Sequence, residues 1–162
     1  GTLAGFGMNI SRAEAFSNGR GICLDTFVFS DPHRSLELNP SETDRLADML
    51  RYAALGTLDA EQLLRSRPKP SRRHGAEVEH SVRFNNDASE NATLIEIVAQ
   101  DRPGLLHDLA QAISSAGLNI EVVLVNTEGH KALDVFYVTR ERHKLDAAAG
   151  SALEQILRSA SG

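Results

Sequence analysis

The sequence predicts an α+β fold made of two similar units, each a small antiparallel sheet with helices packed on it. First, apolar runs of strand length alternate with helix-like patterns along most of the 162 residues. Second, the motif Gly-Met-Asn-Ile at residues 7–10 recurs as Gly-Leu-Asn-Ile at residues 117–120. Third, Leu-Asp-Thr-Phe at residues 24–27 recurs as Leu-Asp-Val-Phe at residues 133–136. An internal repeat of this kind indicates a duplicated structural unit.

The first unit is expected to span residues 1–66. Residues 2–7 are typical of the last turns of a helix that ends at a glycine. This unit is therefore expected to be truncated at its N-terminus, without its own first strand and the turn after it, as in a fragment of a longer chain. The other elements predicted here are strands at 9–16 and 22–29, a hairpin turn at 17–21, and helices at 40–56 and 59–65.

Residues 67–77 are basic and contain two prolines, which predicts a linker between the units. The second unit is expected to span residues 78–162. Alternation of apolar and polar residues over 78–86 predicts a strand with one wet face, paired with the apolar strand at 94–99. The remaining elements predicted in this unit are a helix at 104–116, strands at 120–126 and 132–139, and a helix at 145–158.

The order of these elements predicts a ferredoxin-like βαββαβ topology for both units. The helical crossover makes the first and third strands neighbours, and the topology needs a fourth strand on the other side of the first. After Arg158 the sequence has no room for that strand. We therefore expect residues 78–86 to supply the fourth strand of the second unit from upstream in the sequence.

Asp101, Arg102, Pro103 and Gly104 form the turn between a strand and a helix. Asp101 can cap the free N–H groups of the first helical turn, and Pro103 suits the start of a helix. Gly104 lets another group approach the backbone closely. Such a helix end can bind the carboxylate of a small ligand. The same residues would also suit a plain strand-to-helix connection.

Composition and charge restrict the possible functions. The chain is 41% hydrophobic and 24% charged, which is ordinary for globular proteins. Its formal charge of −5 disfavours a general nucleic-acid binder. Cys23 is the only cysteine, so a disulfide framework and a cysteine-rich metal site are excluded. Because no signal peptide or membrane-length apolar run is visible, we expect no membrane partner and a cytoplasmic location.

No residue pattern in the sequence is typical of a catalytic or metal centre. The six histidines are scattered without metal-ligand spacing, and His107 and Asp108 are helix neighbours whose side chains point in different directions. Asp25 and Asp134 occupy equivalent strand positions and could form a carboxylate pair, although a repeat also duplicates scaffold residues. We therefore predict a non-catalytic fragment with no metal site.

These motifs carry a family resemblance. Asp-Arg-Pro-Gly-Leu at 101–105 and Gly-Leu-Asn-Ile at 117–120 are similar to the first turn and the entry to the second strand of ACT domains. The chain more widely resembles the C-terminal tandem ACT region of bacterial PII uridylyltransferase/uridylyl-removing enzymes, strongly over 78–140 and more weakly over 1–56. The matching segments are FNNDAS at 84–89, LIEI at 94–97, DRPGLL at 101–106 and DVFYVT at 134–139.

The resemblance implies regulation rather than catalysis. In that family the ACT pair senses glutamine and shifts distant catalytic domains between attaching UMP to the PII signal protein and removing it. The upstream catalytic domains would need a divalent metal and UTP, whereas the fragment itself would need no cofactor. ACT sites commonly lie between two domains, so the other repeat or another chain could supply half of the pocket. By matching position, the implied ligand-binding residues are Asp101, Arg102, Pro103, Gly104, Leu105, Leu106, Asn119 and Ile120.

Two other functions are compatible with the sequence. The chain could be a stand-alone tandem ACT regulator or the sensing tail of another amino-acid enzyme. It could also be a structural dimerisation module whose exposed sheet edges pair. The expected partners are accordingly a small amino acid, upstream catalytic domains, the PII protein through the full-length enzyme, and a second copy through the ACT sheets.

Overall fold

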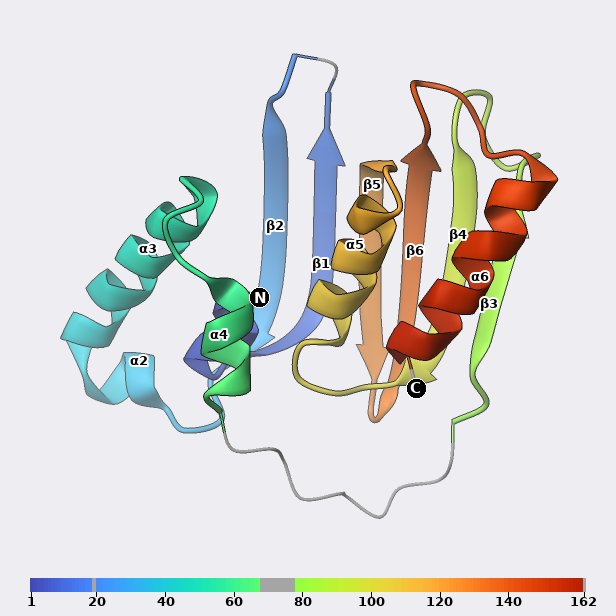
Figure 1. Ribbon diagram of the computed structural model, residues 1–162. Helices are drawn as coiled ribbons and strands as arrows, with labels where there is room; N and C mark the ends of the chain where they lie inside the picture. The colour runs from blue at the N-terminus through green and yellow to red at the C-terminus, as the bar shows by residue number, and fades with distance from the viewer. Residues whose placement is uncertain (19, 68–77, 162) are drawn as a thin grey trace.

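The computed structural model describes residues 1–18, 20–67 and 78–161, and Figure 1 shows a single layer of strands with helices lying over it. Gly19 of the predicted hairpin turn and residues 68–77 of the predicted linker lie outside the described residues. The strands form a six-stranded sheet in the order β2-β1-β5-β6-β4-β3. They are β1 (Asn9–Ser17), β2 (Cys23–Ser30), β3 (Ser81–Asn85), β4 (Thr93–Gln100), β5 (Asn119–Glu128) and β6 (Lys131–Thr139).

Helices α5 and α6 cover one face of the second unit, whereas α1 to α4 lie beside the first unit, with α1 next to α4 (Figure 1). They are α1 (Thr2–Phe6), α2 (Ser35–Leu38), α3 (Pro40–Ala54), α4 (Ala60–Arg65), α5 (Leu105–Ser115) and α6 (Ala147–Ser161). Among the described residues, no helix combines the length and the apolar character that crossing a membrane requires.

The second unit has the predicted ferredoxin-like topology. After β4, helix α5 crosses over to β5, and β6 then returns to lie between β5 and β4, antiparallel to both. Strand β3 pairs antiparallel with the free side of β4, from Ser81 opposite Val98 to Asn85 opposite Leu94. The prediction that an upstream segment supplies the fourth strand is therefore confirmed.

The two units share one continuous sheet. Strand β1 pairs antiparallel with β5, from Arg12 opposite Asn126 to Phe16 opposite Val122, while its other side pairs with β2. The first unit also contains α1, which ends at Gly7 in the left-handed conformation, in agreement with the predicted helix end. Because β2 is the outermost strand on this side, most of its side chains are exposed.

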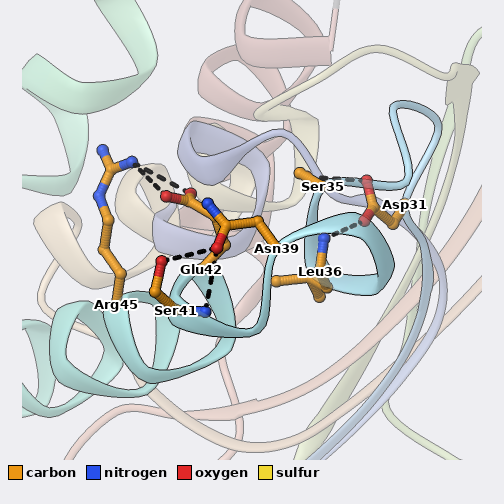
Figure 2. Close-up of polar contacts among 7 residues, drawn as sticks. All are labelled: Asp31, Ser35, Leu36, Asn39, Ser41, Glu42 and Arg45. Carbon is orange, nitrogen blue, oxygen red and sulfur yellow. Dashed lines mark hydrogen bonds and ion pairs between the residues drawn. The ribbon is translucent and has the colours of Figure 1, made fainter.

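Two capping interactions shape the region between β2 and α3 (Figure 2). The Asp31 carboxylate accepts hydrogen bonds from the Leu36 N–H at 2.7 Å and the Ser35 hydroxyl at 3.0 Å, which stabilises the short helix α2. Asn39 caps α3 by accepting from the Ser41 N–H, and Pro40 occupies the first helical position. The sequence did not predict α2, because its single turn depends on the Asp31 side chain rather than on an apolar pattern.

The main hydrophobic core belongs to the second unit. Phe136 of β6 and Ile95 of β4 face each other across the sheet and are fully buried, under Leu109 and Ile113 of α5. Helix α6 adds Leu153 and Leu157 to the same core. The first unit contributes a much smaller cluster built on Leu3, Met8 and Leu46.

Candidate functional site

The Asp-Arg-Pro-Gly turn leaves the N-terminus of α5 without a side-chain cap. Gly104 is the N-cap residue and has φ 87° and ψ −5°, a left-handed conformation that glycine adopts at little cost. The expectation that Asp101 caps the helix is wrong, because the turn holds Asp101 against the β5–β6 hairpin instead. Its N–H donates to the His130 carbonyl at 2.8 Å. Pro103 precedes the first helical residue, Leu105, by two positions.

A cavity of about 420 Å³ lies beside this turn, where the two units meet. Its floor is formed by small and branched side chains that β1, β5 and β6 direct to the face carrying the helices. Helix α5 forms one wall, and α1 and α3 of the first unit form the other. The lining includes Asn9, Ile10, Ala13, Leu106, Val125 and Asp134. The cavity is mostly apolar, with a few polar groups at defined places, as small-ligand sites usually are.

The structure brings together six of the eight predicted site residues. Residues 101–106 all line the cavity. Asn119 and Ile120 do not, because they start β5 at the far end of α5 from the turn (Figure 1). Their repeat equivalents, Asn9 and Ile10, line the cavity in their place.

The antiparallel join between the units explains this exchange. Because β1 and β5 run in opposite directions, the start of β1 lies beside the end of β5 and next to the turn. The first unit therefore supplies to the cavity the same motif that the second unit carries at Asn119. The repeat in the sequence shows that Asn9 and Ile10 are equivalent to Asn119 and Ile120. Only the antiparallel pairing of β1 with β5 shows that Asn9 and Ile10 are the copy that lines the cavity.

Asp134 is the buried acidic group of the site. Its side chain is only 2% exposed, and its Oδ1 atom has no hydrogen-bond partner within the described residues. Burial, and secondarily the nearby negative charge of Asp101, raises the pKa of Asp134 to about 7. Burial also raises the pKa of Asp101, although a hydrogen bond from the Arg102 backbone opposes this effect.

Asp25, the repeat equivalent of Asp134, is also on the cavity side of the sheet but does not pair with it. Strands β1 and β5 lie between β2 and β6, which puts the two backbones roughly 14 Å apart at the usual strand spacing. Carboxylates at that separation cannot share a proton. The two residues are therefore not a catalytic carboxylate pair.

His107 contributes a second polar group that the sequence analysis did not place in the site. It lies in the first turn of α5 and lines the cavity, and its Nε2 atom is buried without a partner in the described part of the chain. Burial lowers the pKa of His107, which favours the neutral imidazole. The sequence alone did not show that His107 lines the cavity, because this depends on how α5 packs against the sheet.

Arg102 fixes the turn against the C-terminal end of α6. Its guanidinium donates to Asp108 at 2.6 Å and to the Ala160 carbonyl at 2.8 Å. Both side chains of the ion pair are partly exposed, so the pair itself adds at most about 1 kcal/mol. The arginine positions the turn, because its donors are used within the protein.

The site combines an uncapped helix N-terminus, an apolar cavity and a buried carboxyl group. Helix N-termini attract anions, whereas a carboxylate attracts cations, so the cavity suits a small molecule that carries both charges. Among residues 1–18, 20–67 and 78–161, no group of three or more His, Cys, Asp or Glu side chains could hold a metal ion.

Comparisons with known proteins show which proteins this chain is similar to. Residues 93–158 match the model of the ACT domain. The chain is 37% identical over 139 residues to the bifunctional uridylyltransferase/uridylyl-removing enzyme of Nitrobacter winogradskyi, covering 86% of this chain and 15% of that enzyme. It is 38% identical to the enzyme of the same name from Gluconobacter oxydans, covering 85% of this chain and 15% of that enzyme.

The similarity to this group of enzymes extends over almost the whole chain. The Caulobacter vibrioides enzyme of the same name is 34% identical over 166 residues, covering 94% of this chain and 17% of that enzyme. The chain thus spans about one sixth of the length of these relatives. The comparisons confirm the resemblance that the sequence motifs indicate.

Proposed function

We propose, from the match of residues 93–158 to the model of the ACT domain, that the chain is a regulatory module that binds a small amino acid between its two units. Glutamine is the first candidate ligand. Within a bifunctional uridylyltransferase/uridylyl-removing enzyme, the module would set the balance between attaching UMP to the PII nitrogen-signalling protein and removing it. Uridylyl transfer, with its divalent metal and UTP, is assigned to other domains.

The observation that carries this proposal is the meeting of the uncapped α5 N-terminus with a cavity shared by both units. The aligned peptide dipoles of a helix place roughly half a positive charge at its N-terminus, where N–H groups are free to donate to a carboxylate. A volume of about 420 Å³ lies within the usual range for small-molecule sites.

The position of the cavity also offers a route for regulation. A ligand that contacts residues of both units binds best to one arrangement of those units and so favours it. Differential binding of about 1–3 kcal/mol is typical of such coupling, and it would be transmitted through the β1–β5 join to whatever is attached to the module.

One observation favours a structural pairing function as a second candidate. Strand β2 is at the edge of the sheet in the described structure, and its Leu24 is 68% exposed and Val28 53% exposed. Exposed apolar edge strands can pair with another chain. This function does not need the cavity, so ligand titration separates the two candidates.

Isothermal titration of the chain with L-glutamine, L-glutamate, L-asparagine and L-serine tests the proposed function. We expect saturable heat with at least one of them, and glutamine as the tightest. No heat and no thermal shift with any of the four would contradict the proposal and favour the structural candidate.

Gly104→Val localises the binding to the helix end. A branched side chain is strained at φ 87°, and relief of this strain would change the orientation of the N–H groups in the first turn, while the new Cβ would contact Leu64 of α4 at 3.4 Å. Gly117→Val is the matched control, because Gly117 has φ 75° at the other end of α5 and faces open space. We expect similar losses of stability, but at least about a tenfold loss of glutamine affinity only in Gly104→Val. Equal glutamine affinities of the two variants would show that glutamine does not bind at the start of α5.

The regulatory part of the proposal needs the full-length enzyme. Glutamine should shift the ratio of PII uridylylation to deuridylylation, and Gly104→Val should make this ratio insensitive to glutamine. Gly117→Val should retain the response. A response that survives in Gly104→Val would contradict the assignment of this cavity as the sensor.

A further inference from the structure

Two buried polar atoms in the described structure lack hydrogen-bond partners, and both belong to the cavity. They are Oδ1 of Asp134 and Nε2 of His107. Buried polar side-chain atoms are nearly always paired in folded proteins, because leaving one unpaired costs the free energy of its desolvation. Because both atoms lie in the same cavity, a molecule bound there could provide their missing hydrogen-bond partners.

The surroundings of Asp134 give no structural reason for a carboxylate. Its neighbours across the sheet on the same face are Ile97 of β4 and Val125 of β5, both apolar and buried. No basic side chain in the described residues forms an ion pair with Asp134, since the nearby Arg102 is bonded to Asp108 and the Ala160 carbonyl.

The other titratable groups around the cavity do not neutralise Asp134 either. The N-terminal amine of Gly1 also lines the cavity, but its charge interacts with Asp108 and His107 rather than with Asp134. Asp101, from the end of β4, is itself acidic and partly buried, and Asp25 of β2 is another carboxylate, on an exposed strand. Burial lowers the pKa of His107 of α5, which disfavours its charged form. The cavity therefore combines the electropositive start of α5 with acidic side chains, of which Asp134 is the most deeply buried.

We infer that Asp134 recognises the ammonium group of the bound amino acid, so that the cavity accepts small molecules with both a free cationic amine and a carboxylate. This inference rests on the proposed function and specifies its ligand class. The ligand carboxylate meets the N–H groups of α5, and its amine donates to the unpaired Oδ1 of Asp134. The unpaired Oδ1 of Asp134 and the uncapped N–H groups of α5 then each gain a partner of opposite charge, while the Nε2 atom of His107 lines the same cavity.

The repeat offers an internal argument for a ligand function of Asp134. Its equivalent in the first unit, Asp25, lies on an exposed strand, where a carboxylate needs no partner. The exposed Asp25 carboxylate is stabilised by water. The buried Asp134 carboxylate lacks this hydration, so its charged form costs free energy unless a cation is bound beside it. A ligand amine would also favour the charged carboxylate, so that binding releases a proton when the free carboxyl is partly protonated.

The test compares two ligands and three forms of the protein. The ligands are L-glutamine and 4-carbamoylbutyrate, which is glutamine without its amino group. The proteins are the wild type, Asp134→Asn, and Glu96→Gln as a matched control. Glu96 carries the same chemistry on β4 but pairs with Val135 on the opposite face of the sheet and is exposed. Circular dichroism and thermal unfolding verify that each variant is folded.

The wild type and Glu96→Gln should bind glutamine about 10- to 100-fold more tightly than 4-carbamoylbutyrate, as expected for a buried charge-assisted hydrogen bond. Asp134→Asn should lose most of this preference by weakening the binding of glutamine alone. Titration near pH 6.5 in buffers of different ionisation enthalpy should show proton release in the wild type and none in Asp134→Asn.

The outcomes separate this inference from the proposed function. Equal wild-type affinity for the two ligands would overturn it without any variant, and so would unchanged glutamine affinity in folded Asp134→Asn. In both cases the amino-acid site itself would stand. Failure of every amino acid to bind the wild type would overturn the proposed function and this inference with it.

Discussion

The two repeats place the same residues in opposite environments. In the first unit, Asp25 and Phe27 lie on the outer strand β2, where Phe27 is 36% exposed. In the second unit, the equivalent Asp134 and Phe136 lie on β6, between two other strands and beneath helices, and Phe136 is fully buried. The contrast shows that neighbouring strands and helices, rather than the local sequence, decide whether a repeated residue is buried or exposed.

Replacing the two phenylalanines should give the largest difference between the units. Phe136→Ala removes a fully buried ring from the main core and should lower the free energy of unfolding by about 3–5 kcal/mol. Phe27→Ala should cost clearly less, at about 1 kcal/mol, because its ring already contacts solvent. Urea unfolding followed by circular dichroism measures both values. Equal losses would show that the first unit is as tightly packed as the second.

The two aspartates should differ in how stability depends on pH. Burial raises the pKa of Asp134 from 3.8 to about 7, so the folded protein binds a proton that the unfolded chain has already released between these values. The ligand-free protein should therefore lose up to about 4 kcal/mol of stability from this group as pH rises from 4 to 7. Unfolding of the wild type and Asp134→Asn across this range measures the difference.

The Asp134→Asn protein should lack this contribution and should become the more stable of the two at pH 8, where the wild type must keep a buried charge. Asp25→Asn provides the comparison, because that side chain is exposed. We expect it to change the free energy of unfolding by less than about 0.5 kcal/mol at either pH. A parallel pH profile for the wild type and Asp134→Asn would contradict the burial argument.

The smallest expected effect on stability concerns the exposed edge of the first unit. Leu24→Lys adds a charge to β2 at a side chain that is 68% exposed, and should change the free energy of unfolding by about 0.5 kcal/mol or less. If β2 pairs with another chain, the same variant should weaken self-association, because edge lysines oppose strand pairing. Sedimentation velocity at several concentrations checks this, with Ile156→Lys, at an exposed apolar residue of α6 away from this edge, as the control.

Much of the fold was predictable because local patterns dominate it. The apolar alternation of β3, the apolar run of β4 and the apolar spacing of three and four residues in α5 identified these elements, and the first two were expected to pair with each other. The helix α2 was not predicted, since it depends on two hydrogen bonds to one aspartate.

The candidate site was predictable only in part. The Asp-Arg-Pro-Gly turn in the sequence predicted the start of a helix with free N–H groups. The contribution of Asn9 and Ile10 to the cavity could not be predicted, because it depends on the antiparallel pairing of β1 with β5. His107 gave no signal, because its importance comes from burial against the cavity.

By itself, the sequence determined the repeat, the strand and helix segments and the turn with a free helix end, because each follows from local periodicity and backbone preference. Only the tertiary structure decided that β1 joins β5, which copy of the Asn-Ile motif meets the turn, and which of two equivalent aspartates is buried. These properties depend on contacts between segments about 100 residues apart, and such contacts leave no mark on local sequence.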